Sequence, residues 1–322
     1  MFFLYVSILI LAFSSVYLIT PFIIKLSNKR KIYDIPDFRK KHISPIPRMG
    51  GLAILSGLII GLLSLIILNN IEFLSQNRLY ILINFMCYLL IFLLGFLDDL
   101  KSISPFLRLS FQFLVASISW IGIVKIKGLF LTTTLLNGYF SIDSDIISYI
   151  ITVIWIVGVI NAINWIDGID GLLIGLSCIY SITFSALSIL NNNFLEGFFS
   201  LLIFFSCIGF LKYNSPPAKI MMGDGGAYLI GFYLSNASLT YGEIPGVINP
   251  ILVISLLLFP VMDMVRVIFQ RIYNGKSPFY PDRTHLHYLF LDNGMPLRKY
   301  LSIIFSLTFF ISIFNIVIQF HN

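Results

Sequence analysis

The chain of 322 residues is 58% hydrophobic and only 11% charged. An average soluble domain is roughly 25% charged, so a water-soluble domain is excluded and lipid is the solvent around most of this chain. Apolar stretches of about 20 residues recur along the sequence, and each can cross a hydrocarbon core of roughly 30 Å as a helix. A small β-barrel and a single anchored domain are therefore excluded as well.

The apolar stretches predict an all-α integral membrane protein, a bundle of about ten transmembrane helices. No repeat, linker or low-complexity tract divides the chain, so we expect a single domain over residues 1–322. The outer loop at residues 127–145, with the sequences TTT and NGY, is compatible with a short hairpin. In chain order, the predicted spans cover residues 2–24, 50–68, 79–97, 106–124, 146–163, 171–190, 194–211, 226–241, 248–268 and 300–320.

The basic residues orient the bundle. No basic residue precedes the first span, whereas four follow it between Lys25 and Lys31, which predicts an uncleaved helix with its N-terminus outside. Ten spans then place both termini outside, and all but three of the 21 Lys and Arg fall on the cytoplasmic side. The net charge of +6 is therefore a topology signal, and it requires no nucleic-acid partner.

The acidic residues are also sorted by side. All three glutamates lie outside with Asp143 and Asp145, and the remaining acids are aspartates at or near the cytoplasmic face. An acid at an apolar helix end is costly unless it is paired or ligates a cation, so these aspartates predict a cation site in a cytoplasmic-face active site. The aspartates that recur at helix ends are Asp98, Asp99, Asp167, Asp170, Asp224 and Asp263.

Two alternatives to a cation site remain open. Each aspartate could simply mark the water boundary of its helix, and Asp263 could form an ion pair with Arg266 three residues later. The adjacent pair Asp98 and Asp99 argues against passive markers, because neighbouring carboxylates repel each other. Since adjacent helical side chains point about 100° apart, we expect one of the two to face the metal or acceptor and the other to orient a neighbour.

Polar residues follow the fifth span at intervals of three. In NAINWIDGIDG, consecutive members of this series share a helix face, and two glycines let the chain bend to bring all four together. The four are Asn161, Asn164, Asp167 and Asp170. Further along, MGDGGAYLIGF places Asp224 among glycines just before an apolar helix, where free backbone amides favour a phosphate.

Two cytoplasmic loops concentrate basic and histidine side chains. The sequence RKKHISPIPRMGG, at residues 39–51, ends in a Pro-x-x-Gly-Gly turn that would hold its charges at the membrane surface, where they suit a phosphate. The loop SPFYPDRTHLHYLFLDNG, at residues 277–294, carries His285 and His287. Their spacing of two points the rings apart on a helix, so hydrogen bonding to a diphosphate is favoured over a shared metal.

Together with two further segments, the motifs described above form a series of six that resembles the polyprenyl-phosphate N-acetylhexosamine-1-phosphate transferase superfamily (glycosyltransferase family 4), and most of all its amino-sugar branch. Two departures bear on sugar selectivity, since Ala227 stands where many members have serine and Tyr288 where many have another histidine. The resemblance runs from about residue 34 to residue 294 and rests on DIPDFRKKHISPIPRMGG, FLLGFLDDLKSISPFLRLSFQ, NAINWIDGIDGL, MGDGGAYLIGF, FPVMDMVRVIFQR and SPFYPDRTHLHYLFLD.

The resemblance implies roles for individual residues. The catalytic centre would contain Asp98, Asp99 and Asp167. The metal ligands would be Asp224, Asp98 and Asn164. The substrates would be bound by Lys41, His42, Arg48, Asn161, Asn164, Asp170, Arg283, His285 and His287.

The resemblance also implies an activity. The enzyme would transfer an N-acetylhexosamine-1-phosphate from a UDP-sugar, UDP-GlcNAc or a deoxy relative, to undecaprenyl phosphate, releasing UMP and initiating a cell-envelope polysaccharide such as O antigen. Mg²⁺, with Mn²⁺ as an alternative, would bridge the diphosphate. The protein would lie among membrane lipid in the cytoplasmic (inner) membrane of a bacterium. A homodimer is left open, as is the choice between direct attack by the lipid phosphate and a phospho-aspartate intermediate.

A secondary transporter or channel is the alternative from another functional class. Such a protein would use the membrane-face aspartates as a relay. It would carry charges near the bilayer midplane, broken helices and an internal repeat. The sequence places its acids at one face and contains no repeat, which favours the enzyme.

Overall fold

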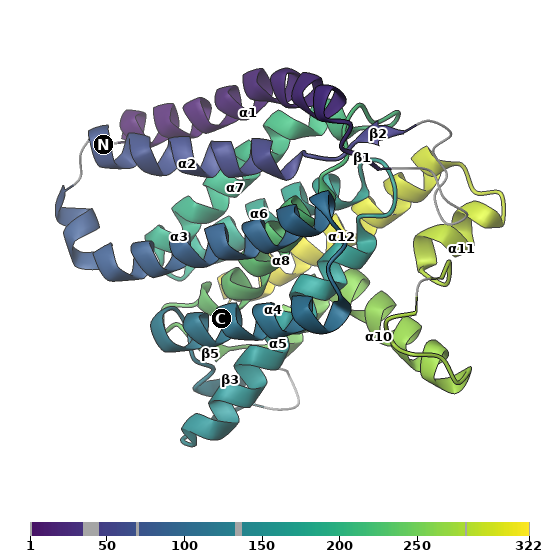
Figure 1. The fold of residues 1–322 in the computed structure, drawn as a ribbon. Helices are drawn as coiled ribbons and strands as arrows, with labels where there is room; N and C mark the ends of the chain where they lie inside the picture. Colours follow the sequence, from purple (N-terminus) through teal and green to yellow (C-terminus); the bar gives the residue numbers. More distant parts are fainter. Residues whose placement is uncertain (1, 35–44, 69–70, 133–136, 281, 322) are drawn as a thin grey trace.

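Helices make up most of the chain in this computed structural model (Figure 1). The structure describes residues 2–34, 45–68, 71–132, 137–280 and 282–321. Within these residues it contains α1 (Phe2–Arg30), α2 (Gly51–Leu68), α3 (Ile71–Leu100), α4 (Pro105–Gly122), α5 (Asp145–Ile166), α6 (Leu172–Leu190), α7 (Phe194–Asn214), α8 (Gly223–Thr240), α9 (Pro250–Leu256), α10 (Leu258–Tyr273), α11 (Leu286–Asp292) and α12 (Leu297–His321).

Each predicted span coincides with a helix or, in one case, a helix pair, but fewer helices pass a strict test of length and hydropathy. In the described residues, six helices are long and apolar enough to cross a membrane, and a seventh span results if α9 and α10 are taken together. The chain is therefore a multi-pass membrane protein, and the total of about ten spans stays a prediction. The six helices are α1, α3, α5, α6, α7 and α12.

The predicted span at residues 248–268 is wrong as a single helix. The axes of α9 and α10 differ in direction by 81°, and only Leu257 separates the two helices. Pro260 explains the break, because its nitrogen has no hydrogen to donate to the carbonyl of Leu256 four residues earlier. The bend sends α10 out of the bundle beside α5, toward the cavity described below (Figure 1).

In the part of the chain that the structure describes, five short strands depart from the predicted all-α class. The expected hairpin within residues 127–145 is confirmed, since β3 (Gly128–Thr132) and β4 (Asn137–Ser141) pair antiparallel. β5 (Val247–Ile248) adds a parallel pair to β3, and β1 (Tyr33–Asp34) pairs antiparallel with β2 (Ile46–Pro47) near the functional site. The strands lie in the connections between helices, so the bundle itself remains helical.

α8 lies at the centre of the bundle, and every one of its residues except Asp224 is buried. Glycines allow α2 and α3 to approach its first turn. A Cβ added to Gly51 would lie 2.4 Å from the nitrogen of Gly226, and one added to Gly95 would lie 2.4 Å from the carbonyl oxygen of Asp224. Only glycine permits such an approach, so the glycine-rich motifs position α8 against its neighbours.

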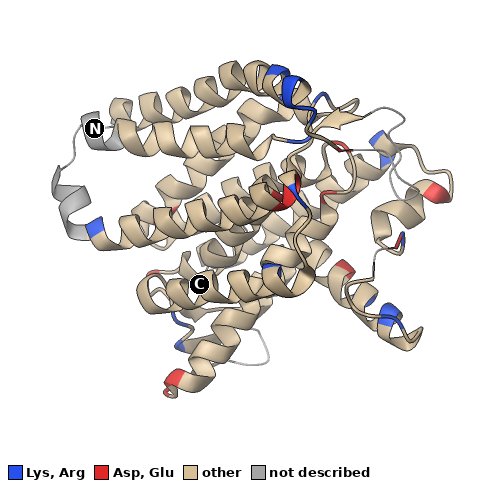
Figure 2. Cartoon of the chain, viewed as in Figure 1, with Lys and Arg blue, Asp and Glu red and all other residues tan. Residues whose placement is uncertain are grey.

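Charged residues gather at one end of this bundle, as Figure 2 shows, and are sparse along the helix surfaces between the two ends. The same end holds the last turn of α3, the last turn of α5 and the first turn of α8. Most of the aspartates singled out in the sequence thus belong to neighbouring segments in space.

Candidate active site

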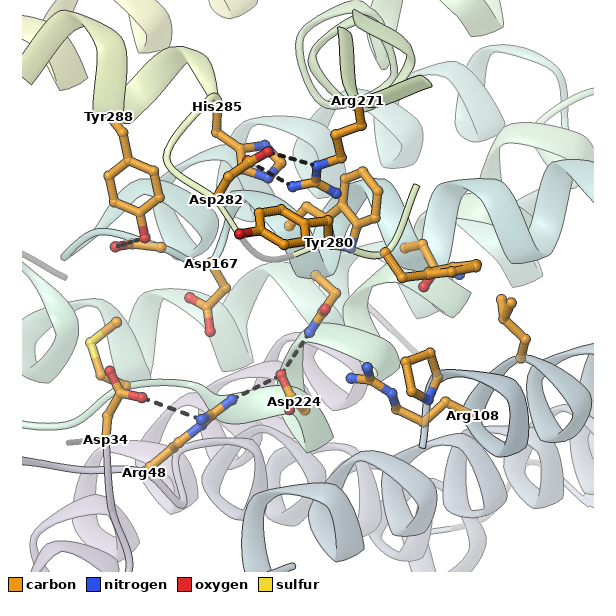
Figure 3. A pocket seen from close by; sticks show the side chains of 18 residues that line it. Asp34, Arg48, Arg108, Asp167, Asp224, Arg271, Tyr280, Asp282, His285 and Tyr288 are labelled. Carbon is orange, nitrogen blue, oxygen red and sulfur yellow. Dashed lines mark hydrogen bonds and ion pairs between the residues drawn. The ribbon is translucent and has the colours of Figure 1, made fainter. Parts of the chain in front are cut away.

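A cavity of about 310 Å³ lies at the charged end of the bundle (Figure 3). Its wall combines the segment after β2, the start of α4, the end of α5, the start of α8, α10 and the loop before α11. Lys41 and His42 lie outside the described residues. Among the other residues predicted from the sequence, those that line the cavity are Arg48, Asn161, Asn164, Asp167, Asp224 and His285.

Arg48 connects three carboxylates that come from three separate segments. Its Nη1 lies 3.3 Å from Asp34 Oδ1, and its Nε lies 2.8 Å from Asp99 Oδ1. Its Nη2 lies 3.0 Å from Asp224 Oδ1 (Figure 3). One guanidinium therefore neutralises a group of acids that would otherwise repel one another.

Asp99 orients the start of α8 instead of facing the cavity. Its Oδ1 accepts a hydrogen bond from the backbone amide of Asp224 at 2.9 Å, and its Oδ2 accepts one from that of Gly225 at 3.1 Å. The expectation that one of the adjacent aspartates orients a neighbour is thus confirmed. The expectation that these amides are free to hold a phosphate is wrong, because Asp99 already accepts hydrogen bonds from two of them.

Asp98 points in another direction and does not line the cavity. Its Oδ2 lies 2.8 Å from Nη1 of Arg108, a residue of α4 that does line the cavity. Its Oδ1 accepts a hydrogen bond from the backbone amide of Ile103 at 2.7 Å. Asp98 therefore fixes Arg108 and the turn between α3 and α4, and its predicted role as a metal ligand remains a prediction.

Asn164 and Asp224 form a pair that faces the cavity. The Nδ2 of Asn164 donates to Oδ1 of Asp224 at 2.8 Å. Asn161, one helical turn earlier, donates to Oε1 of Gln112 at 2.7 Å, which ties the end of α5 to α4. The sequence correctly placed these asparagines on one helix face, and the structure adds their partners from other helices.

The two aspartates that follow α5 separate. Asp167 lines the cavity, where burial raises its pKa to about 7 although Arg48 opposes this change. Asp170 turns away from the cavity and accepts a hydrogen bond from the backbone amide of Ala218 at 2.9 Å. α5 ends at Ile166, and the chain turns before α6 through Gly171, whose φ of +77° is readily adopted by glycine. Only the first three members of the series line the cavity.

Asp263 holds the histidine loop against the bundle. Its Oδ2 lies 2.8 Å from Nδ1 of His285, and its Oδ1 accepts a hydrogen bond from the backbone amide of Leu286 at 3.0 Å. The ion pair with Arg266, at 2.8 Å, is confirmed as part of this network. Asp263 thereby fixes His285 at the cavity wall.

Arg271 fixes the first part of the same loop. It is only 5% exposed, donates to both carboxylate oxygens of Asp282 at 2.9 and 3.1 Å, and lies over the ring of Trp165 at 5.0 Å. Burial alone would raise the pKa of Asp282, but hydrogen bonds from Arg271 and Thr284 lower it to about 2. The pair is therefore ionised at neutral pH and forms one side of the cavity.

Arg271→Lys is expected to lower kcat/KM about tenfold, because an ammonium group cannot replace the two parallel hydrogen bonds to Asp282 or stack on Trp165. Steady-state turnover of the purified variant measures this effect. Arg298→Lys, at an exposed position at the start of α12, is the matched control and should retain the wild-type value. Similar losses in the two variants would argue against a specific role for Arg271.

His287 does not reach the cavity, although the sequence predicted that it binds substrate. It is 0% exposed, its two ring nitrogens have no hydrogen-bond partner, and its ring stacks on His285 with centroids 5.6 Å apart. A Cβ added to Gly168 would lie 2.5 Å from its Nε2. Burial lowers the pKa of His287 to about 3, so the ring is neutral and packs like an apolar side chain.

His287 should make the folded protein sensitive to mild acid. Its folded pKa lies below the unfolded value, so the unfolded state gains a proton first as pH falls below about 6.5. His287 should therefore lower the free energy of unfolding by about 2 kcal/mol between about pH 7.5 and pH 5. Asp167, whose folded pKa is raised to about 7, acts in the opposite direction over the same range. Thermal unfolding in detergent at the two pH values tests this contribution, because the midpoint should change less favourably toward pH 5 in the wild type than in His287→Phe. An unchanged shift in His287→Phe would exclude this residue as the cause.

Arg283 is the remaining predicted residue, and it also lies off the cavity wall. Its Nη2 is 2.6 Å from Asp292 Oδ1, and its guanidinium lies over the ring of Tyr288 at 5.0 Å. Tyr288 does line the cavity. Arg283 thus supports a wall residue from behind.

Several residues that line the cavity were missed as site residues, although the charged and aromatic ones fall within the quoted motifs. The acids and bases among them are paired with the predicted residues or with one another, which no spacing rule in the sequence would reveal. The aromatic members face the cavity from the end of α5, from the loop before α11 and from α11 itself. The missed residues include Asp34, Arg108, Arg271, Asp282, Trp165, Phe279, Tyr280 and Tyr288.

Comparison with known proteins agrees with this site. A family model described as "Glycosyl transferase family 4" matches residues 81–242, which include α8, the two aspartates at the end of α3 and the two that follow α5. The first loop and the histidine loop lie outside the match, but similarity to individual proteins extends over both.

A Bacillus subtilis protein named "Probable undecaprenyl-phosphate N-acetylglucosaminyl 1-phosphate transferase" is 33% identical over 96% of this chain and 84% of its own length. Proteins named "Undecaprenyl-phosphate alpha-N-acetylglucosaminyl 1-phosphate transferase" are similar too. The Haemophilus influenzae protein is 36% identical over 85% of this chain and 76% of its own length, and the Pasteurella multocida protein is 33% identical over 90% and 80%. With this similarity over most of its length and with its carboxylates gathered around one cavity, the chain belongs to glycosyl transferase family 4.

Proposed function

We propose that this protein transfers an N-acetylhexosamine-1-phosphate from a UDP-sugar, with UDP-GlcNAc as the first candidate, to undecaprenyl phosphate, and that it releases UMP. The names of the similar proteins support the acceptor and the amino sugar. The product would initiate a cell-envelope polysaccharide such as O antigen.

The balance of charge around the cavity is the observation that carries this proposal. Carboxylates that line the wall or are bonded to its guanidinium groups outnumber those guanidinium groups, so a further cation would be needed to offset the charge of a donor diphosphate and a lipid phosphate. The carboxylates are those of Asp34, Asp98, Asp99, Asp167, Asp224 and Asp282. The guanidinium groups are those of Arg48, Arg108 and Arg271.

Asp224 and Asn164 fit a magnesium ion that shares its coordination with substrate. Mg²⁺ prefers one or two carboxylates together with water and substrate phosphates to a cage of protein ligands. In keeping with this, the described residues contain no group of three His, Cys, Asp or Glu side chains arranged for a metal. A side-chain oxygen of each residue would bind the ion, which would neutralise charge on the diphosphate. Mn²⁺ is expected to substitute for Mg²⁺.

The protein's own residues would hold the two phosphate groups in position. Arg48 and Arg108 face the cavity from opposite sides of Asp224, and His285 faces it from the loop before α11 (Figure 3). Their donors suit a diphosphate on one side and a single lipid phosphate on the other. An oxygen of the lipid phosphate would then attack the sugar-linked phosphorus directly, with UMP as the leaving group.

The same proposal includes a location. The protein would lie in a bacterial inner membrane with about ten spans, the cavity on the cytoplasmic side and both termini outside. The distribution of Lys and Arg along the sequence supports this orientation. Cysteine labelling from each side of the membrane, at residues near Glu243 and in the loop at 277–294, tests it.

The decisive experiment is an assay for the lipid product. Purified protein, undecaprenyl phosphate, Mg²⁺ and a panel of UDP-HexNAc donors should yield a lipid-linked sugar diphosphate whose mass identifies the sugar. UMP should appear in equal amount. A panel without any lipid-linked product would contradict the proposal. The break between α9 and α10 is a feature that a transporter would also show, but uptake into vesicles without a lipid product would be required to favour that function.

A further inference from the structure

Arg48 occupies one of the two carboxylate oxygens of Asp224, the residue proposed to bind the metal ion. Oδ1 of Asp224 lies 3.0 Å from Nη2 of Arg48 and 2.8 Å from Nδ2 of Asn164 (Figure 3). Divalent cations such as Mg²⁺ bind carboxylate oxygens at about 2.0–2.1 Å, and they repel a guanidinium group bonded to the same oxygen. A metal on this oxygen and Arg48 in its present position therefore exclude each other.

The guanidinium group can leave Asp224 without leaving the site. Its Nε is bonded to Asp99 at 2.8 Å, and this contact can remain as a pivot while the rigid guanidinium plane turns and carries Nη1 and Nη2 away from Asp34 and Asp224 together. Asp99 cannot follow the movement, because its two oxygens accept hydrogen bonds from the amides of Asp224 and Gly225. Arg48 thus has one fixed contact and one end that can move.

The backbone around Arg48 is fixed to the segment before α8. The amide of Met221 donates to the carbonyl of Pro47 at 2.8 Å, and the amide of Gly50 donates back to the carbonyl of Met221 at 3.0 Å. Any exchange of partners is therefore restricted to the side chain, which is 27% exposed and lines the cavity.

We infer that Arg48 and the metal ion are alternative partners of Asp224, and that the donor's diphosphate frees Asp224 for the metal by accepting hydrogen bonds from the Nη2 end of Arg48. This inference rests on the proposed function and adds an order of binding to it. The metal binds weakly to the enzyme alone and tightly together with a nucleoside diphosphate. By linkage, the metal strengthens nucleotide binding by the same factor.

Binding of Mn²⁺ to the purified protein without nucleotide, followed by electron paramagnetic resonance, tests the competition. Arg48→Gln is expected to bind Mn²⁺ about tenfold more tightly than the wild type, because the competing cation is gone. Arg108→Gln removes the same charge from the same cavity, but Arg108 pairs with Asp98, so its Mn²⁺ affinity should change less than about threefold. No gain in Arg48→Gln, or equal gains in both variants, would overturn the inference.

A second measurement adds UDP. In the wild type, saturating UDP should strengthen Mn²⁺ binding at least about tenfold, and in Arg48→Gln this factor should be smaller. Arg48→Lys keeps a charge but cannot bridge three carboxylates, so its Mn²⁺ affinity should be intermediate, which guards against a misfolded glutamine variant. If the wild type binds Mn²⁺ together with UDP but Arg48→Gln has the same Mn²⁺ affinities as the wild type, the role of Arg48 is overturned and the proposed function stands. If the wild type binds neither Mn²⁺ nor UDP and makes no lipid product, the proposed function is overturned.

Discussion

Asp224→Asn is expected to lower turnover on the order of a thousandfold, the largest effect of any single substitution in this site. The asparagine keeps the shape of the side chain and can still accept the hydrogen bond from Asn164. It removes the negative charge that pairs with Arg48 and that would hold the metal. Mn²⁺ binding should be lost together with turnover, whereas the elution profile in detergent should match that of the wild type.

The control for Asp224→Asn is the same exchange at Asp145, which is exposed at the start of α5, far from the cavity. Asp145→Asn should retain wild-type turnover and Mn²⁺ affinity. Normal turnover of Asp224→Asn at low magnesium would remove Asp224 from the metal site. It would also remove the basis for the competition with Arg48.

The helices could be predicted from the sequence because long apolar stretches leave the backbone few alternatives in lipid. The aspartates at the ends of those stretches also indicated the position of the cavity, since Asp167 and Asp224 line it. The break at Leu257 was readable in principle, since Pro260 lies inside the ninth predicted span. Its angle was not, because packing of α10 beside α5 sets the direction of the second helix.

The partners of each charge could not be predicted, because they depend on which segments meet in space. Asp98 and Asp99 are adjacent, yet one binds Arg108 and the other binds Arg48 and the amides of α8. His285 and His287 differ by two residues, yet only His285 lines the cavity. The spacing of residues along the sequence cannot distinguish such neighbours, because their partners are set by the segments that pack against them in the folded protein.

Those contacts bear on whether the reaction passes through a phospho-aspartate. Both oxygens of Asp98 accept hydrogen bonds, from Ile103 and Arg108, and both oxygens of Asp99 accept them from the first turn of α8. Either aspartate would have to give up a bond before it could attack phosphorus. These bonds give Asp98 and Asp99 a positioning role and argue against either of them as the attacking group.

Isotope exchange should separate the two mechanisms. The reaction breaks one phosphoanhydride bond and makes another, so its equilibrium constant should lie within a few powers of ten of unity, each tenfold step being about 1.4 kcal/mol. Labelled UMP should therefore enter UDP-sugar when enzyme, unlabelled UDP-sugar and lipid phosphate are present. With direct attack, rigorous removal of lipid should abolish the exchange, because UMP leaves only when the lipid attacks.

Exchange in lipid-free enzyme would show instead that UMP leaves in a first half-reaction on the protein. Asp167, which lines the cavity and is not bonded to an arginine in the way that Asp98 is, would then be the first nucleophile to test. Asp167→Asn should abolish lipid-free exchange under that mechanism. The same variant cannot distinguish the mechanisms by turnover alone, because loss of a carboxylate beside the diphosphate slows both, and so the lipid-free exchange is the measurement that decides.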